Sequence, residues 1–265
     1  MKLATWNVNS LKVRLPQVLE WLGTSGVDVL CLQELKMPHD KFPLAEFEAI
    51  GYQACWAGQK TYNGVAVISR DPARSVQINM PGFPDDHQRL IAATLPSPQG
   101  DIRVVSVYCP NGQALDSDKY TYKLAWFAAL REWLVTELAA HPRMVVLGDY
   151  NVAPADADVH DPAKWEGDVL VSPPEREAFE ALLNLGFTDA FRHFPQEEKM
   201  FSWWDYRRMA FRRNAGLRID HALVSSALLP FCTACEIDKA PRRNEQPSDH
   251  TPVIVTLDLP VEKGA

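Results

Sequence analysis

The sequence predicts an α/β fold in which two mainly antiparallel sheets pack face to face and helices cover their outer faces. Ten short apolar runs have the length and composition of strands, whereas three segments show apolar residues at helical spacing. Parallel neighbours need a long crossover, usually a helix, and three helices are too few to connect so many strands in that way. With 265 residues, 46% of them hydrophobic, the chain can bury the core of such a sandwich as one unit.

The expected helices cover residues 13–22, 122–138 and 175–185. The second is amphipathic and ends before Pro142, and the third begins behind Pro173-Pro174 and ends at Gly186. The expected strands cover residues 2–7, 27–34, 52–57, 64–70, 90–95, 102–109, 143–149, 218–224, 232–237 and 252–258. Because no linker, composition change or repeat separates these elements, we expect one domain over residues 1–260 and a flexible tail at 261–265.

The N-terminus and the cysteines indicate a protein of the cytoplasm. Met1 leads into an apolar strand without a signal-peptide core, and no stretch approaches the ~18 apolar residues that a membrane span needs. Five cysteines leave one unpaired in any disulfide scheme, so we interpret them as reduced thiols in the core. We therefore expect a cytoplasmic monomer without membrane contact.

Six of the apolar runs are bordered at one end by a polar side chain that an ordinary turn would not require. Each such side chain must be hydrated or paired, which a protein built for stability alone has little reason to arrange. If the sheets bring these ends to one rim, they form an acidic site with one histidine, as in a divalent-metal centre that cleaves phosphodiesters. The side chains are Asn7, Glu34, Tyr108, Asp149, Asp220 and the pair Asp249-His250.

Glu34 and Asn7 are candidate oxygen ligands for Mg²⁺. Glu34 follows the buried run 29–33, so its carboxylate emerges at the strand end, and Asn7 occupies an equivalent position. The alternatives are a helix cap or a salt bridge with Lys36 for Glu34, and an ordinary turn residue for Asn7.

Asp149 and His250 are the candidate catalytic groups. In an extended segment Asp149 and Asn151 point the same way, so Asp149 could polarise a water that Asn151 steers. The alternative is a Gly-Asp turn after a strand. A carboxylate such as Asp220 could orient His250 and raise its pKa, and the imidazole could then stabilise a pentacovalent phosphate or accept a proton. A lone histidine is otherwise more often structural.

The segment 199–218 is the strongest candidate for nucleic-acid contact, although the whole chain carries a net charge of -7. It contains six cations against Asp205 alone, interleaved with Trp203 and other aromatic residues. Cations position a phosphate backbone and aromatic faces stack on bases or sugars, so Arg207 and Arg212 are candidate DNA contacts. The alternative is a solvated loop whose tryptophans point inward.

The motifs together resemble the exonuclease III family of DNA-repair nucleases within the deoxyribonuclease I-like superfamily. The resemblance covers the whole chain in the family's order, and its pieces are Trp6-Asn7-Val8-Asn9-Ser10, Leu32-Gln33-Glu34-Leu35-Lys36, Tyr62-Asn63-Gly64-Val65, Val107-Tyr108, Gly148-Asp149-Tyr150-Asn151, Pro174-Glu175-Arg176, Gly216-Leu217-Arg218-Ile219-Asp220 and Ser248-Asp249-His250.

The resemblance implies a four-layered α/β sandwich and specific roles at its centre. It implies Mg²⁺, with Mn²⁺ as a substitute, held by Glu34 with Asn7 and Asp249 nearby. It further implies a water activated by Asp149 and oriented by Asn151. The remaining residues it assigns to the scissile phosphate are the pair His250 and Asp220, together with Tyr108.

The resemblance also implies a DNA substrate. Trp203, Leu217 and Ile219 match a pocket for a flipped sugar or terminal nucleotide. Family members that cut abasic sites carry Asn, two small residues ending in Gly, and Phe beside this pocket, where this chain has Asp168-Val169-Leu170-Val171. Bulkier Val169 and Leu170 predict a 3′–5′ exonuclease and 3′-end processing enzyme of base excision repair, acting on double-stranded DNA with 3′ ends or lesions, and leave abasic-site endonuclease activity open.

Two other functions fit parts of the same pattern. The superfamily includes phosphatases of small molecules and lipids that use the same centre, so the fold alone does not select DNA. A catalytically silent nucleic-acid-binding module would bind without turnover. Hydrolysis of a phosphoinositide but not of DNA would indicate the first, and tight binding without cleavage the second.

Overall fold

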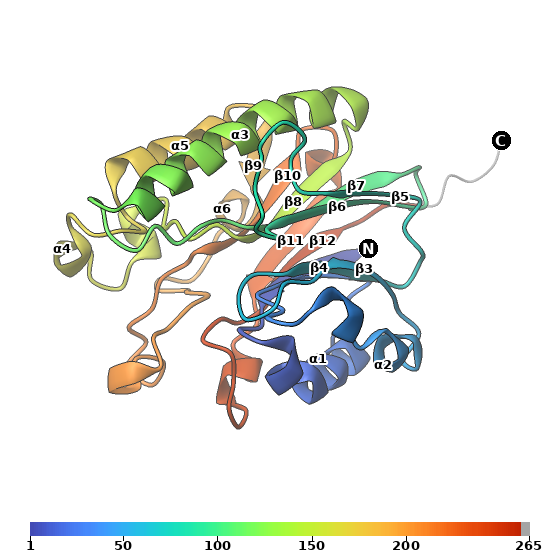
Figure 1. Cartoon of the computed structure of the whole chain (residues 1–265), viewed down its shortest axis with the longest axis horizontal. Coiled ribbons are helices and arrows are strands. Elements are labelled where there is room, and N and C mark those ends of the chain that lie inside the picture. The colour runs from blue at the N-terminus through green and yellow to red at the C-terminus, as the bar shows by residue number, and fades with distance from the viewer. Residues whose placement is uncertain (261–265) are drawn as a thin grey trace.

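A computed structural model describes residues 1–260, which form two six-stranded sheets packed face to face (Figure 1). The first sheet has the order β11-β12-β1-β2-β4-β3, and the second has the order β5-β6-β7-β8-β10-β9. The strands of the first sheet are β1 (Lys2–Asn7), β2 (Val29–Gln33), β3 (Gln53–Ala57), β4 (Val65–Ser69), β11 (Cys232–Ile237) and β12 (Val253–Leu257). Those of the second are β5 (Ser75–Ile78), β6 (Leu90–Leu95), β7 (Ile102–Tyr108), β8 (Met144–Asp149), β9 (Phe187–Asp189) and β10 (Asp220–Ser225).

The predicted sandwich of mainly antiparallel sheets flanked by helices is confirmed. Only β1–β2 and β7–β8 are parallel among the strand pairs of residues 1–260, and each parallel pair is joined by a helix on the outer face. These helices are α1 (Leu11–Ser25) and α3 (Asp118–Ala140). The other helices are α2 (Leu44–Glu48), α4 (Pro162–Trp165), α5 (Pro173–Leu183) and α6 (Ala190–His193), and the 3₁₀ turns are η1 (His39–Lys41), η2 (Asp156–Asp158), η3 (Arg207–Met209), η4 (Leu229–Phe231) and η5 (Ala240–Arg243).

Three apolar layers hold the four structural layers together. Alternate side chains of both sheets meet in the central core, for example Val67 and Val145. The opposite faces pack outward, the first sheet under α1 and α2 and the second under α3 and α5 (Figure 1). Because successive strand residues point to opposite faces, nearly continuous apolar strands such as β4 and β6 are explained by burial on both sides.

The helix boundaries follow local capping chemistry. The Ser117 side chain accepts a hydrogen bond from the Tyr120 backbone at the start of α3, and Ser172 and Glu175 form a capping box at the start of α5. Gly26 ends α1 in a left-handed conformation with φ 67°. The structure extends α1 beyond the expected 13–22 at both ends.

Two strands were missed by the sequence analysis. β5 is a short edge strand with Val76 and Ile78 exposed, and β9 has three residues, so neither shows the alternation of a half-buried strand. The expected strand 218–224 begins only at Asp220, because pairing with β8 starts at Asp149.

All five cysteines are free thiols, as expected, and four of them are buried. Within residues 1–260 no helix is long and apolar enough to cross a membrane. The expected flexible tail at 261–265 lies outside the described residues.

Candidate active site

Strand ends from both sheets meet at one rim of the sandwich. The parallel pairing places Asn7 beside Gln33 in one sheet and Tyr108 beside Asp149 in the other. β10 runs antiparallel to β8, so its first residue, Asp220, lies opposite Asp149. These strand ends therefore share one rim, as predicted. Asp220 lies at the same rim because it is the first residue of β10 and not the last residue of a strand.

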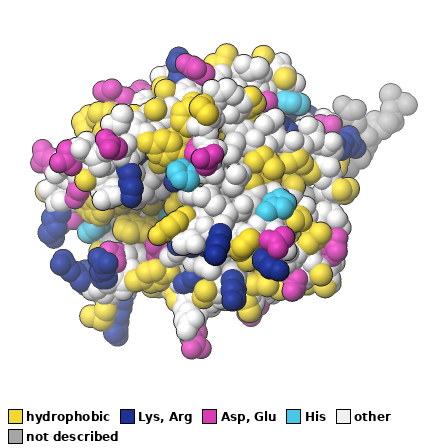
Figure 2. All heavy atoms as spheres, viewed as in Figure 1, with side chains coloured by type: hydrophobic (Ala, Val, Ile, Leu, Met, Phe, Trp, Pro, Cys, Tyr) yellow, Lys and Arg dark blue, Asp and Glu magenta, His cyan; other side chains and the backbone are white. Residues whose placement is uncertain are grey.

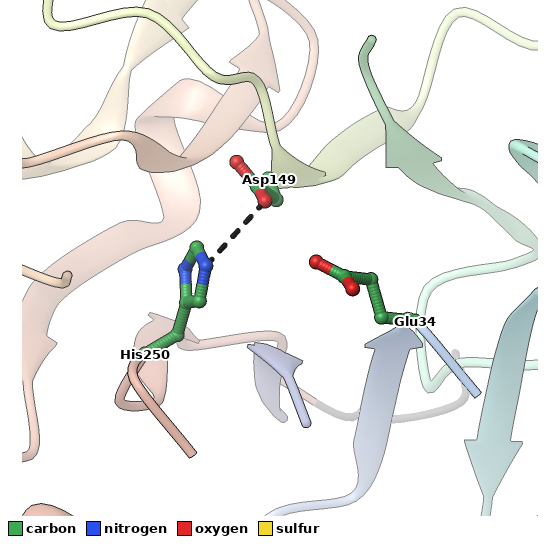
Figure 3. A group of neighbouring side chains, drawn as sticks. All are labelled: Glu34, Asp149 and His250. Carbon is green, nitrogen blue, oxygen red and sulfur yellow. Dashed lines mark ion pairs between the residues drawn. The ribbon is translucent and has the colours of Figure 1, made fainter. Parts of the chain in front are cut away.

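Glu34, Asp149 and His250 form the centre of this rim (Figure 3). One potential ligand atom from each lies within 4.8 Å of the others, and Asp149 is 1% exposed. The His250 Nε2 atom lies 3.7 Å from Asp149 Oδ2. The three side chains converge from the residue after β2, from the end of β8 and from the segment before β12, which are remote in sequence (Figure 3).

Asn7 joins the two carboxylates. Its Nδ2 group donates to Glu34 Oε1 at 2.8 Å and to Asp149 Oδ2 at 2.9 Å, while its Oδ1 accepts from the Asn9 backbone at 2.9 Å. From the sequence, the amide oxygen is expected to face the metal position. In this structure the amino group occupies that side, and Asn7 holds the carboxylates together.

Asp249 lies beside this centre and is held by two donors. Trp203 Nε1 donates to its Oδ2 and Asn9 Nδ2 to its Oδ1, both at 3.0 Å. Lys36 Nζ in turn donates to Asn9 Oδ1 and forms a 2.9 Å salt bridge with Glu34. Asn9 was missed as a site residue, although it stands two residues after Asn7 in the same motif. The salt bridge considered as an alternative for Glu34 is present.

The Asp220 carboxylate fixes the His250 ring. Asp220 Oδ2 lies 2.9 Å from His250 Nδ1, and both residues are buried. Burial lowers the pKa of His250, but the carboxylates of Asp220 and Asp149 more than offset it and raise the pKa to about 10. His250 is therefore an imidazolium at neutral pH in the metal-free protein. Asp220 Oδ1 has no hydrogen-bond partner among the described residues.

Asp149 is a buried carboxyl group whose pKa lies near neutral pH. Burial is the main cause that raises its pKa to about 7, partly opposed by His250. Its Oδ1 accepts the backbone N–H of Asn151 at 2.9 Å, and Asn151 adopts φ 51°. The segment after Asp149 is therefore a turn, and the expectation that it is extended is wrong.

The turn directs Asn151 toward the loop after β7. Asn151 Nδ2 donates to the Cys109 carbonyl at 2.9 Å, and Asn111 Nδ2 donates to Asn151 Oδ1 at 3.0 Å. Asn111 was missed because nothing in its local sequence marks it as polar at a strand end. It lines a cleft of about 480 Å³ beside the centre, together with Glu34, Tyr62, His87, Arg89 and Tyr108.

Tyr108 lies between this cleft and the carboxylates. Burial and the charges of Glu34 and Asp149 hold the pKa of its phenol well above the ordinary value, so it remains a hydrogen-bond donor. The Arg89 guanidinium lies over its ring, 4.9 Å from the centroid.

The basic segment divides into an exposed and a buried part. Arg207 and Arg212 are exposed, in the orange segment around η3 that projects from the sandwich in Figure 1. Lys and Arg side chains gather in the corresponding part of Figure 2. Arg218, in contrast, is 1% exposed and pairs with Asp158 and Asp189. Asp158 therefore has a structural role.

The residues expected to form a nucleotide pocket are in contact, but most are closed to solvent. Leu217 is 0% exposed, Ile219 2% and Leu170 5%, and they share one apolar cluster with the partly buried Val169 and Trp203. Leu170 adopts φ 78°, a conformation that disfavours a leucine. Its side chain packs in the same apolar cluster as Trp203.

Comparison with known proteins gives one consistent result. Residues 4–250 match the Endonuclease/Exonuclease/phosphatase family. Exodeoxyribonuclease III of Haemophilus influenzae is 33% identical, with 96% of this chain and 98% of that protein covered. A 3′ phosphatase from Neisseria, solved with a product DNA hairpin, is 48% identical with a TM-score of 0.94, covering 98% of this chain and 100% of its own.

An AP endonuclease from Archaeoglobus fulgidus is 38% identical, with a TM-score of 0.93 over 98% of this chain and 100% of that chain. The structural likeness extends over both sheets, and the sequence likeness extends over nearly the full length of each relative. The chain therefore belongs to the Endonuclease/Exonuclease/phosphatase family, and its resemblance to exonuclease III is confirmed.

Proposed function

We propose that this protein hydrolyses phosphodiester and phosphomonoester bonds at the 3′ ends of double-stranded DNA, as a 3′–5′ exonuclease and 3′-end processing enzyme of base excision repair. The observation that carries the proposal is the convergence of half-buried Glu34 with buried Asp149, Asp220 and His250 at the rim of the sandwich. Relatives named exodeoxyribonuclease III and 3′ phosphatase support DNA and its 3′ end as the substrate. We further propose that the protein acts as a cytoplasmic monomer.

The donor set at this rim fits Mg²⁺, with Mn²⁺ as a substitute. Glu34 offers carboxylate oxygens, which Mg²⁺ prefers, the Asp149 carboxylate adds negative charge beside it, and His250 is withheld by its proton and by Asp220. Glu34 would be the principal ligand, with Asn7 aligning it, and Asp249 would contribute negative charge nearby. When bound, the ion supplies Lewis-acid stabilisation of charge on the phosphate and leaving oxygen.

Asp149 is suited to accept a proton from the attacking water. Its raised pKa of about 7 makes it a stronger base than an exposed carboxylate, and the hydrogen bond from Asn7 fixes one oxygen. The Asn151 side chain lies on the same turn and orients the water or a phosphate oxygen. Asn111 restrains that amide.

His250 is suited to stabilise the pentacovalent transition state. Its Nδ1 is engaged by Asp220, so the Nε2–H and the positive charge are directed to the side of Asp149 where a phosphate oxygen can lie. The Tyr108 phenol remains protonated and can donate to another phosphate oxygen. Both groups are positioned before substrate arrives.

Cations in two places support a DNA duplex as the substrate. Arg207 and Arg212 are exposed in the segment around η3, and Arg89 lines the cleft beside the centre. Leu170 fills the apolar space that an internal flipped sugar would need, whereas a terminal nucleotide can approach with little unstacking cost. These features favour 3′ ends over internal abasic sites.

A side-by-side cleavage assay tests the proposal. We expect Mg²⁺-dependent trimming of a recessed 3′ end and release of a 3′ phosphate, slower incision at an internal abasic analogue, and no hydrolysis of a phosphoinositide. Chelation should abolish activity and Mg²⁺ or Mn²⁺ should restore it. Phosphoinositide hydrolysis without DNA cleavage would favour the lipid-phosphatase alternative, and full activity after exhaustive chelation would exclude the metal mechanism.

A further inference from the structure

We propose that Lys123 and Glu175 are positioning residues that hold three loops of the active site in one arrangement. These are the loop after β7, the loop after β8 and the segment 168–172 beside the apolar cluster around Leu170, which we call the wall. The pair thereby sets the orientation of Asn151 and the shape of the wall. The proposal rests on the function proposed above. It concerns a buried ion pair that the proposed chemistry does not use, because neither side chain has solvent-exposed surface.

Lys123 connects the helix α3 to the two loops that follow the parallel strands β7 and β8. Its Nζ group donates to the Asn151 carbonyl at 2.7 Å and to the Asn111 carbonyl at 3.1 Å, and it contacts Glu175 Oε1 as its third acceptor. All three ammonium protons therefore have an acceptor. Since Asn111 and Asn151 also share a side-chain hydrogen bond, one cation fixes the backbone beneath both amides.

Glu175 connects the same cation to the wall. Its Oε1 accepts the Leu170 backbone N–H at 3.0 Å, and its Oε2 accepts the backbone N–H and the hydroxyl of Ser172 at 3.1 and 2.5 Å. The Leu170 carbonyl accepts the N–H of Ala153, two residues beyond Asn151. The left-handed Leu170 is thus held from both of its backbone groups.

The three loops are packed so closely that they cannot shift independently. A Cβ atom added at Gly112, in the loop after β7, would lie 3.1 Å from Lys123 Cδ and 3.1 Å from Val169 Cγ2. The Tyr120 hydroxyl lies 2.7 Å from Ser172 Oγ. A displacement of the pair would therefore move the Asn151 turn and the wall at residues 168–172 together.

Stability alone does not explain a pair buried so completely. Removing an ammonium and a carboxylate from water is costly, and apolar residues of similar size commonly do as well or better. Burial lowers the pKa of Lys123 and Glu175 opposes that change. What the pair supplies that an apolar contact could not is a set of directed hydrogen bonds to backbone groups of all three loops.

A second buried ion pair offers a matched control on the same helix. Arg103 on β7 contacts Glu137 near the far end of α3 at 2.9 Å, with side chains 3% and 16% exposed. It also joins the helix to the second sheet, but it lies at the end of β7 remote from the rim. Arg103→Met removes a buried cation of this region without touching the site.

The experiment compares Lys123→Met, Glu175→Gln and the double variant with Arg103→Met, all as full-length protein with Mg²⁺. We expect kcat on a recessed 3′ end to fall about 10- to 100-fold in the first three, because small misplacements of a reacting geometry have effects of that size, while KM changes little. Arg103→Met should lower thermal stability but leave kcat within about twofold. The double variant leaves no uncompensated buried charge, so it should fold even if the single variants do not.

Two further measurements separate positioning from general destabilisation. Amide hydrogen exchange at Leu170 and Ser172 should accelerate in the Lys123 and Glu175 variants and not in Arg103→Met, and the ratio of abasic incision to 3′-end trimming should change in the same variants. Unchanged exchange at these amides, or equal loss of kcat in Arg103→Met, would overturn the inference. Absence of DNA cleavage by the wild type would overturn the proposed function instead, while the exchange result would still test the positioning.

Discussion

The two ends of the sandwich are built from the same strands but differ in how far their charged side chains are exposed to solvent. At the end remote from the site, Arg70 and Asp28 line an open groove of about 360 Å³, and their side chains are 47% and 35% exposed. At the other end the carboxylates of Asp149 and Asp220 are 1% and 0% exposed. Both ends therefore carry charges, and the remote end also holds the Arg103–Glu137 pair, but the rim buries two carboxylates beside His250.

This difference in exposure distinguishes charges that keep the protein soluble from charges that could take part in catalysis. Exposed pairs such as Arg70–Asp28 contribute little to stability, because water solvates both partners and salt screens them. Buried carboxylates carry a desolvation penalty that must be offset by partners such as His250 and Asn7. At the rim these buried groups converge on one centre beside a cleft, so it is where chemistry is expected.

The largest effect is expected from the buried end. Asp149→Asn and His250→Asn should each slow the chemical step by about 100-fold or more, the scale of general-base and electrostatic groups, while DNA affinity is largely retained. Single-turnover kinetics with saturating enzyme would measure the step directly. A loss of binding with an unchanged single-turnover rate would mean that these groups hold DNA and do not act in catalysis.

The coupling of Asp220 to His250 gives the next largest effect. Because the folded-state pKa of His250 is raised to about 10, its contribution to stability is fully present below pH ~6.5 and is lost as the pH rises through about 10. Asp220→Asn removes the charge at 2.9 Å, so the pKa of His250 should fall by about one unit or more. An NMR titration of the imidazole in chelated protein would measure it, and an unchanged value would assign the shift to other groups.

A smaller effect is expected where the rim meets the apolar cluster around Leu170. Leu170→Gly, alone or with Val169→Ala, should raise abasic incision about tenfold with little change in 3′-end trimming, because a ~1.4 kcal/mol obstruction is removed. Loss of a buried side chain will also lower stability by about 2–5 kcal/mol, which thermal unfolding would detect. Strong abasic incision by the wild type would show that Leu170 does not exclude internal sites.

The smallest effect is expected from exposed arginines, two in the segment around η3 and one at the end remote from the site. Arg207→Ala should weaken DNA binding a few-fold and reduce the slope of log affinity against log salt by about one, and Arg212→Ala should do the same. Arg70→Ala, matched for charge and exposure, should leave affinity, salt slope and kcat unchanged. If all three variants retain the wild-type salt dependence, the segment around η3 is not the DNA contact.

The sequence predicted the rim well because strand ends are a local signal with a simple geometric consequence. Apolar runs that finish at Asn7, Glu34 and Asp149 are visible without tertiary information, and parallel or adjacent strands bring such ends together. The same logic placed Tyr108 and His250 correctly at the rim. It missed β5 and β9, because short edge strands bury too little to show a pattern.

Residues that act through pairing could not be predicted in the same way. Asn9, Asn111 and Lys123 acquire their partners only when loops from different layers meet. Arg218 was predicted to belong to a basic surface segment. In the structure it is buried, because it forms ion pairs with Asp158 and Asp189, which are distant in sequence. The turn at Asn151 depends on a hydrogen bond to Asp149, so neighbouring strand residues gave no indication of its positive φ.

Asp220 Oδ1 has no hydrogen-bond partner within residues 1–260, and this bears on when the active site becomes organised. A buried carboxylate oxygen without a donor costs about 1–3 kcal/mol or more, and the imidazolium at the other oxygen is the chief compensation for that charge. The orientation of this ion pair is therefore established once, during folding, at the expense of global stability. In the reaction proposed above, the substrate would meet dipoles that are already aligned, so no solvent or side chain would have to reorient as charge develops on the phosphate.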